Sequence, residues 1–500
     1  MAETLNHLLE HGEPDAVAIA VPDGPVLTYR GLREEVERTA HALTEFGLGR
    51  GDTIGFVLPN SIETIVVFLA SATAGTAAPL NPAYKEDEFR FYLEDTNAKA
   101  LILRPGESEA ARSARGKDVL LIEASTDDRG RVTLSTNGTK ARPGRTPAAD
   151  PQPDDIALLL HTSGTTSRPK QVPLRHRNLH FSAQNIAGTY DLGPEDVALC
   201  VMPLFHIHGL MASTMATLSS GGAVIVPQRF DPMTFWQAVR SQRATWYSAV
   251  PTIHQMLLMR FRGERPAGAE GLRFIRSSSS ALSKETMQQL ESAFGAPVVE
   301  AYGMTEASHQ MASNPLPPAD RRAGTVGRAT GIDVGVMGEG GALLTADSPG
   351  EVVIKGPSVI DGYANNAAAN SEAFVDGWFR TGDQGHLSRD GYLSLIGRLK
   401  EMINRGGEKI APREIDDVLL KHPAVGEAVA FGTPHEKWGE EVAAAVVLKG
   451  EATERELIAF ARERLADYKV PRRLYIVDQI PRTATGKIQR RAVASALNEA

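Results

Sequence analysis

The chain has 500 residues, of which 42% are hydrophobic and 23% are charged, with a formal net charge of −8 and a single cysteine. This composition is ordinary for a globular protein, disfavours non-specific nucleic-acid binding, and excludes an intramolecular disulfide and a cysteine zinc site. No secretory signal opens the chain and no apolar run approaches the roughly 20 residues of a membrane span, so we expect a cytoplasmic protein without a membrane partner.

Short apolar runs alternate with amphipathic stretches from Thr28 to about Val336. The runs predict strands at 52–59, 99–105, 119–124, 155–161, 197–203, 222–227 and 273–280, and the stretches predict helices that include 61–75 and 283–294. This alternation is typical of a layered α/β architecture. The segment 135–155 is rich in Pro and Gly and is predicted to be a surface connection.

Past Val352 the pattern changes to strands and turns, and the C-terminal part predicts a separate small α+β unit. Residues 424–432 and 440–450 have the composition of strands. A capping box of Thr453 with Glu456 indicates the start of a helix.

A polar loop containing one glycine follows the predicted strand 155–161. It supplies hydroxyl groups, backbone amides and a lysine: Thr162, Ser163, Gly164, Thr165, Thr166 and Lys170. These donors favour a phosphate-binding loop, although the glycine spacing is not that of a Walker motif. A plain polar surface loop is the alternative, because Ser, Thr and Gly are common in loops.

Other segments are unusually polar for their positions. They are PLFHIHGL (203–210), predicted to end a strand, EAYGMTEASHQM (300–311), predicted to follow a strand at 297–299, GWFRTGD (377–383), GRLKEMINRGGEK (397–409) and PRTATGKIQR (481–490). Each residue by itself has a structural explanation, such as a surface carboxylate or a solvated lysine. In this order, however, the motifs make the chain from about Thr28 to Arg491 resemble the adenylate-forming superfamily of acyl-CoA synthetases, adenylation domains and beetle luciferases.

The resemblance implies a large N-terminal domain of layered α/β subdomains with a β-barrel-like subdomain, followed by a small mobile α+β domain. The implied boundaries are 1–396 for the N-terminal domain, 397–401 for a hinge that contains Lys400, and 402–500 for the C-terminal lid. The implied enzyme is an ATP-dependent acid–CoA ligase. A carboxylate attacks the α-phosphate of ATP and releases pyrophosphate, and CoA then displaces AMP from the acyl-adenylate.

The resemblance also implies residue roles. Thr305 lies at the phosphates, Glu306 binds Mg²⁺, and Lys487 bridges the attacking carboxylate and the α-phosphate. The remaining implied positions are an adenine wall (Glu300, Ala301, Tyr302, Gly303), ribose ligands (Asp383, Arg398), a CoA channel (Gly406, Gly407) and a catalytic histidine (His206). Related ligases are acetylated on the catalytic lysine, which implies a lysine acetyltransferase as a partner for Lys487.

One position departs from the family pattern. Gln171 follows Lys170 where the family usually has a glycine, which lets the backbone approach phosphate or adopt positive φ. Two outcomes are open: a reoriented loop with slower adenylation, or little effect.

An arginine indicates which acid is bound. The implied acyl pocket contains His206, His208, Arg276, Ser279, Ser280 and His309. Arg276 lies within a predicted strand, and a buried guanidinium without a partner is strongly destabilising. It should therefore meet a carboxylate, either an internal Asp or Glu or a second carboxylate of the substrate.

The second option favours a small dicarboxylic acid, and the motif wording resembles the oxalate–CoA ligases most. Malonate is the nearest alternative, because one CH₂ is worth only about 1–3 kcal/mol of discrimination. Fatty or aromatic acids would need an apolar pocket. Loading of a carrier protein in trans is an alternative from another class, and a non-catalytic nucleotide-binding scaffold is a third.

Overall fold

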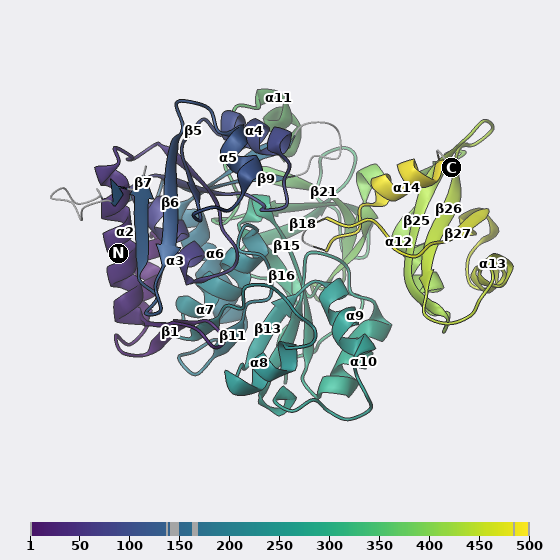
Figure 1. The fold of residues 1–500 in the computed structure, drawn as a ribbon. Helices are drawn as coiled ribbons and strands as arrows, with labels where there is room; N and C mark the ends of the chain where they lie inside the picture. The colour runs from purple at the N-terminus through teal and green to yellow at the C-terminus, as the bar shows by residue number, and fades with distance from the viewer. Residues whose placement is uncertain (1–2, 137–138, 141–149, 163–168, 484–485, 499–500) are drawn as a thin grey trace.

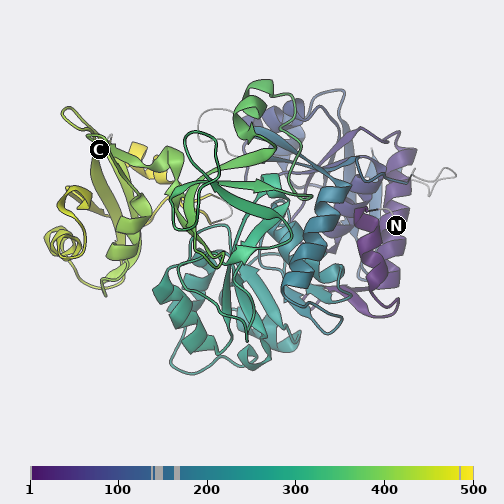
Figure 2. The same cartoon turned by 180° about the vertical axis from the view of Figure 1, so that it is seen from behind.

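The computed structural model describes residues 3–136, 139–140, 150–162, 169–483 and 486–498. A large N-terminal domain and a small C-terminal domain lie side by side, with the N-terminus and the C-terminus at opposite ends of the molecule (Figure 1). The same two bodies are evident from behind (Figure 2). Within the described residues, we find no helix with the length and apolarity required to cross a membrane.

The first sheet of the N-terminal domain has the order β17-β16-β15-β14-β13-β11-β12-β1-β2 and is parallel from β15 to β1. Its strands are β1 (Val17–Ala20), β2 (Val26–Thr28), β11 (Val197–Leu199), β12 (Ala223–Ile225), β13 (Trp246–Ala249), β14 (Phe274–Ser277), β15 (Val298–Met304), β16 (His309–Ser313) and β17 (Arg328–Ala329). The order makes β13, β14 and β15 neighbours, so residues of three distant segments meet at their ends.

The second sheet has the order β10-β9-β4-β3-β5-β6-β7-β8. Its strands are β3 (Thr53–Val57), β4 (Thr76–Pro79), β5 (Ala98–Leu103), β6 (Leu120–Thr126), β7 (Val132–Thr136), β8 (Thr139–Lys140), β9 (Ile156–Thr162) and β10 (Lys170–Arg175). β9 and β10 form an antiparallel pair at one edge, and the predicted phosphate loop connects them.

Helices cover and join these sheets. They are α1 (Leu5–Leu8), α2 (Tyr29–Glu45), α3 (Ile62–Ala74), α4 (Glu86–Asp95), α5 (Glu109–Ala114), α6 (His176–Thr189), α7 (Ala216–Leu218), α8 (Phe235–Ser241), α9 (Pro251–Met259), α10 (Lys284–Phe294) and α11 (Ala367–Ala373). Ser61 caps α3 by accepting a bond from the amide of Thr64, and nearly every residue of α3 is buried. One apolar core contains residues of both sheets together with α2 and α3, which is why α3 is hydrophobic on all sides.

A third, antiparallel sheet follows, with β18 (Asp333–Met337), β19 (Gly350–Lys355), β20 (Phe374–Val375), β21 (Trp378–Leu387) and β22 (Leu393–Arg398). The C-terminal domain has β23 (Ile403–Arg405), β24 (Glu408–Ile410), β25 (Val425–His435), β26 (Gly439–Leu448) and β27 (Arg473–Ile476), with α12 (Pro412–Leu419), α13 (Glu454–Arg462) and α14 (Arg490–Asn498). A core of its own supports this domain.

The predicted α/β fold with a small α+β domain is confirmed, including the capping box of Thr453 and Glu456 at α13. Two local expectations were wrong. Residues 203–210 do not end a strand, because β11 ends at Leu199 and a π-helical turn (His208–Met215) begins within the motif. Residues 300–303 do not follow a strand, because β15 extends through them to Met304.

Candidate active site

Three sequence-predicted residues meet where β15 approaches the third sheet. Asp383 and Arg398 are opposite each other in the β21–β22 pair, with Arg398 Nε 2.7 Å from Asp383 Oδ1. The hydroxyl of Tyr302, in β15, donates to Asp383 Oδ2. Burial, followed by the charge of Asp383, raises the pKa of Tyr302 well above its usual range. A protonated phenol, a carboxylate and a guanidinium therefore share one site.

The rest of the predicted adenine wall lies in the same strand. Glu300 and Ala301 are buried, and Glu300 Oε1 accepts a bond of 2.9 Å from the Leu282 amide. Burial raises the pKa of Glu300 to about 7. Gly303 passes close to the neighbouring strand, since a Cβ there would lie 2.2 Å from the carbonyl oxygen of His309. Only glycine fits this backbone approach.

The base of the predicted phosphate loop is described, and its tip is not. Thr162 and Lys170 pair across β9 and β10, whereas Ser163, Gly164, Thr165 and Thr166 lie outside the described residues. Lys170 Nζ lies 4.5 Å from the ring centroid of Tyr363. The Tyr363 hydroxyl donates to Glu306 Oε1 at 2.9 Å. Tyr363, which sequence reasoning missed, thus contacts both the loop lysine and the predicted metal carboxylate; its only signal was an aromatic residue in a polar turn.

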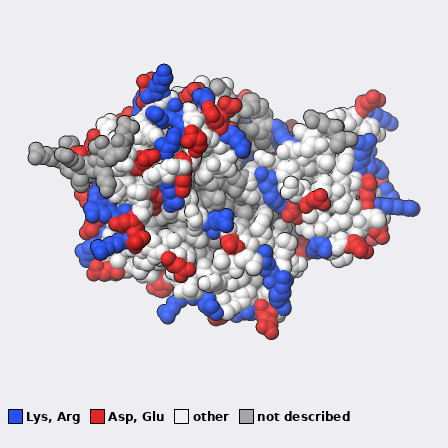
Figure 3. All heavy atoms as spheres, in the orientation of Figure 1, with Lys and Arg blue, Asp and Glu red and all other residues white. Residues whose placement is uncertain are grey.

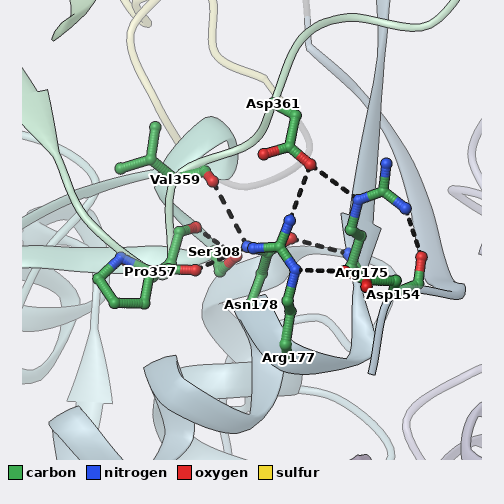
Figure 4. Close-up of polar contacts among 9 residues, drawn as sticks. Asp154, Arg175, Arg177, Asn178, Ser308, Pro357, Val359 and Asp361 are labelled. Atoms are coloured by element: carbon green, nitrogen blue, oxygen red, sulfur yellow. Dashed lines mark hydrogen bonds and ion pairs between the residues drawn. The ribbon is translucent and has the colours of Figure 1, made fainter. Parts of the chain in front are cut away.

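The segment 357–361 holds the backbone of Glu306 in place. Glu306 is buried in a single turn of helix (Thr305–Ala307), with Thr305 half-buried beside it, and its backbone carbonyl accepts a 2.9 Å bond from the Ile360 amide. Figure 4 shows how β10 and α6 anchor this segment, through contacts of Arg175 and Arg177 with Asp361 and of Asn178 with Pro357. The position of Glu306 therefore depends on the same strand that carries the phosphate-loop lysine.

Gln171, the departure from the family pattern, fits its position as a strand residue. It is opposite His161 in the β9–β10 pair, is 8% exposed, and does not adopt a left-handed φ. Its side chain points to the end of α4, where Nε2 lies 2.7 Å from Asp95 Oδ2. Asp95 Oδ2 is also 3.0 Å from His161 Nε2. Glycine is therefore not needed for the backbone here, and Gln171 ties the base of the loop to α4.

Arg276 is fully buried in β14 and bonds only neutral groups. Its Nε donates to the Tyr190 hydroxyl at 2.9 Å, Nη1 to Ser248 Oγ at 2.9 Å, and Nη2 to Gln310 Oε1 at 3.0 Å. In the part of the chain that the structure describes, no Asp or Glu forms an ion pair with it. The expected internal carboxylate is thus not found there, which leaves the charge uncompensated.

Histidines complete the Arg276 pocket. His208 and His309 are buried, with ring centroids 5.0 Å apart in an edge-to-face arrangement. Burial, with the neighbouring histidines and Arg276 as further causes, lowers both pKa values well below the usual range, so both rings are neutral at pH 7. Among Arg276, His208 and His309, the positive charge is therefore that of Arg276.

A chain of hydrogen bonds connects Arg276 with Ser279. His208 Nε2 is 2.7 Å from Ser248 Oγ, and His208 Nδ1 is 2.9 Å from Ser279 Oγ. Ser248 Oγ also accepts from Arg276, so the His208 ring connects the hydroxyl that contacts the guanidinium with the hydroxyl of Ser279. Ser279 has a φ of 70°, strain typical of functional sites, and Ser280 is half-buried beside it.

The C-terminal domain contributes Lys487 to the same region. Desolvation of its ammonium group, followed by the charge of Arg398, lowers the pKa of Lys487. Burial and then the charge of Lys487 lower the pKa of His206 to about 4. The His208 amide donates to His206 Nδ1 at 3.2 Å, so His206 carries its proton on Nε2. Lys487, His206 and Arg398 are thus brought together from three distant segments.

The predicted hinge and channel residues lie where the third sheet leads into the C-terminal domain. Lys400 is in a single turn (Leu399–Glu401) that follows β22. Gly406 and Gly407 form the turn between β23 and β24 with φ values of 62° and 97°. A Cβ on Gly406 would lie 2.7 Å from the ring of Trp438, so this turn needs glycine for both its conformation and its packing.

Comparison with known proteins agrees with this geometry. The family model described as "AMP-binding enzyme" matches residues 10–364, and the one described as "AMP-binding enzyme C-terminal domain" matches residues 414–487. The chain belongs to the AMP-binding enzyme family. ATP as a substrate fits this AMP-binding enzyme family.

This AMP-binding enzyme has relatives of nearly its own length. It is 45% identical to an oxalate–CoA ligase of Arabidopsis thaliana (99% of this chain, 98% of the relative) and 44% identical to one of Saccharomyces cerevisiae (96% and 94%). It is 38% identical to a sulfoacetate–CoA ligase of Cupriavidus necator (95% and 94%). The crystal structure of ATP-bound MatB from Rhodopseudomonas palustris matches with a TM-score of 0.90 and 30% identity (100% and 99%), and apo MatB with a TM-score of 0.79.

Proposed function

We propose that this AMP-binding enzyme is an ATP-dependent acid–CoA ligase whose acid is oxalate. One oxalate oxygen attacks the α-phosphorus of ATP, and the bond to the β-phosphate oxygen breaks to release pyrophosphate. The CoA thiol then attacks the acyl carbon, loses its proton, and displaces AMP. The observation that carries the proposal is Arg276, a buried cation that bonds only neutral groups beside the nucleotide residues.

Oxalate fits this pocket by charge and size. It is a dianion at neutral pH, so one carboxylate can react while the other neutralises the buried Arg276 guanidinium. The relatives support an acid with a second anionic group, since oxalate and sulfoacetate each have one. A fatty acid would leave the guanidinium buried without a counter-charge, which is unfavourable.

The nucleotide residues divide the work on ATP. Tyr302, Glu300, Ala301 and Gly303 form the adenine wall, and Asp383 with Arg398 holds the ribose hydroxyls. The loop from Thr162 to Lys170 binds the β- and γ-phosphates, and Thr305 lies beside them. Lys487 neutralises charge shared by the attacking carboxylate and the α-phosphate, which is the main requirement of an in-line phosphoryl transfer. His206 keeps its Nε2–H available to the reacting groups.

The described residues suit a magnesium ion. Glu306 presents a hard carboxylate oxygen ligand, buried and oriented by Tyr363. Mg²⁺ bound there would neutralise phosphate charge during pyrophosphate release. Glu306 would then be the protein ligand, with Tyr363 keeping its carboxylate in one orientation.

Lid movement would separate the two half-reactions. We assign residues 1–396 to the N-terminal domain, 397–401 to the hinge around Lys400, and 402–500 to the lid, with the Gly406–Gly407 turn lining the CoA channel. Lys487 serves adenylation and leaves before CoA enters. The position of Lys487 on the proposed mobile lid also supports modification by a lysine acetyltransferase, which mass spectrometry of the cellular protein would detect.

We propose that the enzyme is located in the cytoplasm. Its proposed ligands are small molecules. Acidic and basic side chains are interspersed over the face in Figure 3, and the net charge is −8, which supports the absence of a nucleic-acid partner.

The test is AMP formation with ATP, Mg²⁺ and CoA across oxalate, malonate, acetate, coumarate and octanoate. We expect oxalate to be preferred and oxalyl-CoA to be detected by mass spectrometry. A preference for octanoate or coumarate would overturn the dicarboxylate assignment while keeping the ligase. Adenylate formation with oxalate but no CoA ester would favour loading of a carrier protein. ATP binding without AMP formation for any acid would indicate a scaffold.

A further inference from the structure

The segment around Lys487 is a closed hairpin. Arg482 and Ile488 form an antiparallel bridge, and the Gln489 amide donates to the Pro481 carbonyl at 3.0 Å. Inside it, the Thr483 amide donates to the Lys487 carbonyl at 2.8 Å. The backbone of Lys487 therefore moves together with the hairpin.

A residue of the N-terminal domain receives this hairpin. Thr252 lies in the first turn of α9, and its hydroxyl donates to the Gly486 carbonyl at 3.0 Å. Arg482 Nη1 donates to Thr252 Oγ1 at 2.8 Å and to the Gly486 carbonyl at 3.0 Å. The three groups form a closed ring of hydrogen bonds between the domains. Gly486 directly precedes Lys487 in the chain, so the ring fixes the backbone from which the lysine side chain extends.

Two further features help the hairpin to pack against Thr252 at the start of α9. Arg482 Nη2 lies 2.7 Å from Glu427 Oε2, which holds the guanidinium on the C-terminal domain while Nη1 faces Thr252. Gly486 has a φ of 83°, and a Cβ there would lie 3.2 Å from Val250 Cγ2. The hairpin can therefore sit against the start of α9 only with glycine at position 486.

We propose that Thr252 is a positioning residue that, together with Arg482, latches the Lys487 hairpin in the active site for adenylation only. The inference rests on the proposed two-step reaction. Only a few hydrogen bonds form the latch, and net hydrogen bonds of this kind are modest in strength, so the latch can open once the adenylate has formed. Thr252 acts through the backbone of Gly486 and does not touch the reacting atoms.

The test separates the half-reactions in Thr252→Val and Thr252→Ser. Adenylation is followed as pyrophosphate release without CoA, and transfer as decay of enzyme-bound adenylate after CoA is added to single-turnover mixtures. Losing one or two hydrogen bonds should slow adenylation by Thr252→Val roughly 3- to 30-fold. Transfer should be unchanged or faster, because the lid leaves more easily. Thr252→Ser keeps the hydroxyl and should restore adenylation.

A matched control and a second variant make the result decisive. Thr345→Val changes an exposed threonine on the third-sheet side and should alter neither step. Arg482→Met should slow adenylation as Thr252→Val does, and the double variant should add little, since both break one ring of bonds. Equal slowing of both steps, slowing of neither, or full additivity would overturn the latch. Failure of the proposed function is distinct, because the unmodified enzyme would then release no pyrophosphate with any acid, or would release it without forming a CoA ester.

Discussion

The Arg276 pocket and the Lys487 hairpin both present a cation to the proposed substrate, but the protein supports them in opposite ways. Arg276 has no solvent exposure and is held by the side chains of Tyr190, Ser248, His309 and Gln310 within a sheet. Lys487 lies on a hairpin of the small domain that a few hydrogen bonds attach to the other domain.

The difference matches the division between recognition and catalysis that we propose for the two residues. A cation fixed in the core cannot move or be hydrated, so it is best satisfied by an anion of matching position, which gives selectivity. A cation on a lid can be withdrawn, so it can serve one step and leave before the next. Substitutions in the two regions should therefore fail in different ways.

The largest effect is expected for Arg276→Leu. It removes the charge that meets the second carboxylate, so AMP formation with oxalate should fall at least about 100-fold, as for other buried charge pairs that lose a partner. Activity with acetate should fall far less, if it is measurable. Arg380→Met, which removes an exposed arginine paired with Glu351, is the control. Undiminished use of oxalate by Arg276→Leu would refute the pocket assignment.

A large effect confined to one step is expected for Lys487→Ala. Without the cation, pyrophosphate release should slow about 100-fold or more, the range seen when one charge-stabilising donor is removed from a transition state. Transfer of a preformed adenylate to CoA should be nearly unchanged. Stopped-flow measurement of each step checks this, with Lys449→Ala as an exposed control on the same domain. Slowing of transfer to the same extent would place Lys487 in both steps.

A smaller effect is expected for Gln171→Gly, the change toward the family pattern. It removes the bond to Asp95 at the base of the phosphate loop, so the KM for ATP should rise roughly 3- to 10-fold with kcat little changed. Asp95→Asn should raise the KM less, because an amide still accepts from Gln171. A lower KM for ATP in the glycine variant would show that Gln171 hinders the loop.

The smallest effect concerns how much the stability of the protein falls at acidic pH. Burial lowers the pKa of His254 to about 4, below its unfolded value of about 6.5, so unfolding takes up a proton in this range. The stability that the neutral ring contributes is complete above pH 6.5 and is lost as the pH falls toward 4. Glu300, with its raised pKa, acts in the opposite direction.

The thermal unfolding temperature of His254→Gln should therefore fall less steeply than that of the unmodified protein as the pH is lowered from 6.5 to 5. The difference is at most about 1.4 kcal/mol per pH unit for one histidine. Parallel pH profiles for the two proteins would show that His254 does not titrate on unfolding.

Much of the fold could be predicted because its strands are covered on both faces. The runs at 99–105 and 155–161 are apolar throughout, and β5 and β9 occupy 98–103 and 156–162. The histidine motif at 203–210 was misplaced, because its apolar residues suggested a strand end and the π-helical turn has no comparable pattern. The candidate site residues that lie in recognisable motifs could be named from the sequence. Their contacts could not be predicted, because Tyr302 is far in the chain from Asp383 and Arg398.

By itself, the sequence determined the layered α/β architecture, the small C-terminal domain, and the order of motifs that indicates an AMP-binding enzyme. These follow from local periodicity and composition, which act over a few residues. Only the tertiary structure decided that Arg276 has no described carboxylate partner, that Gln171 bonds Asp95, and that Thr252 receives the Lys487 hairpin. Such contacts depend on strand order and domain docking, which bring together groups that no local pattern relates.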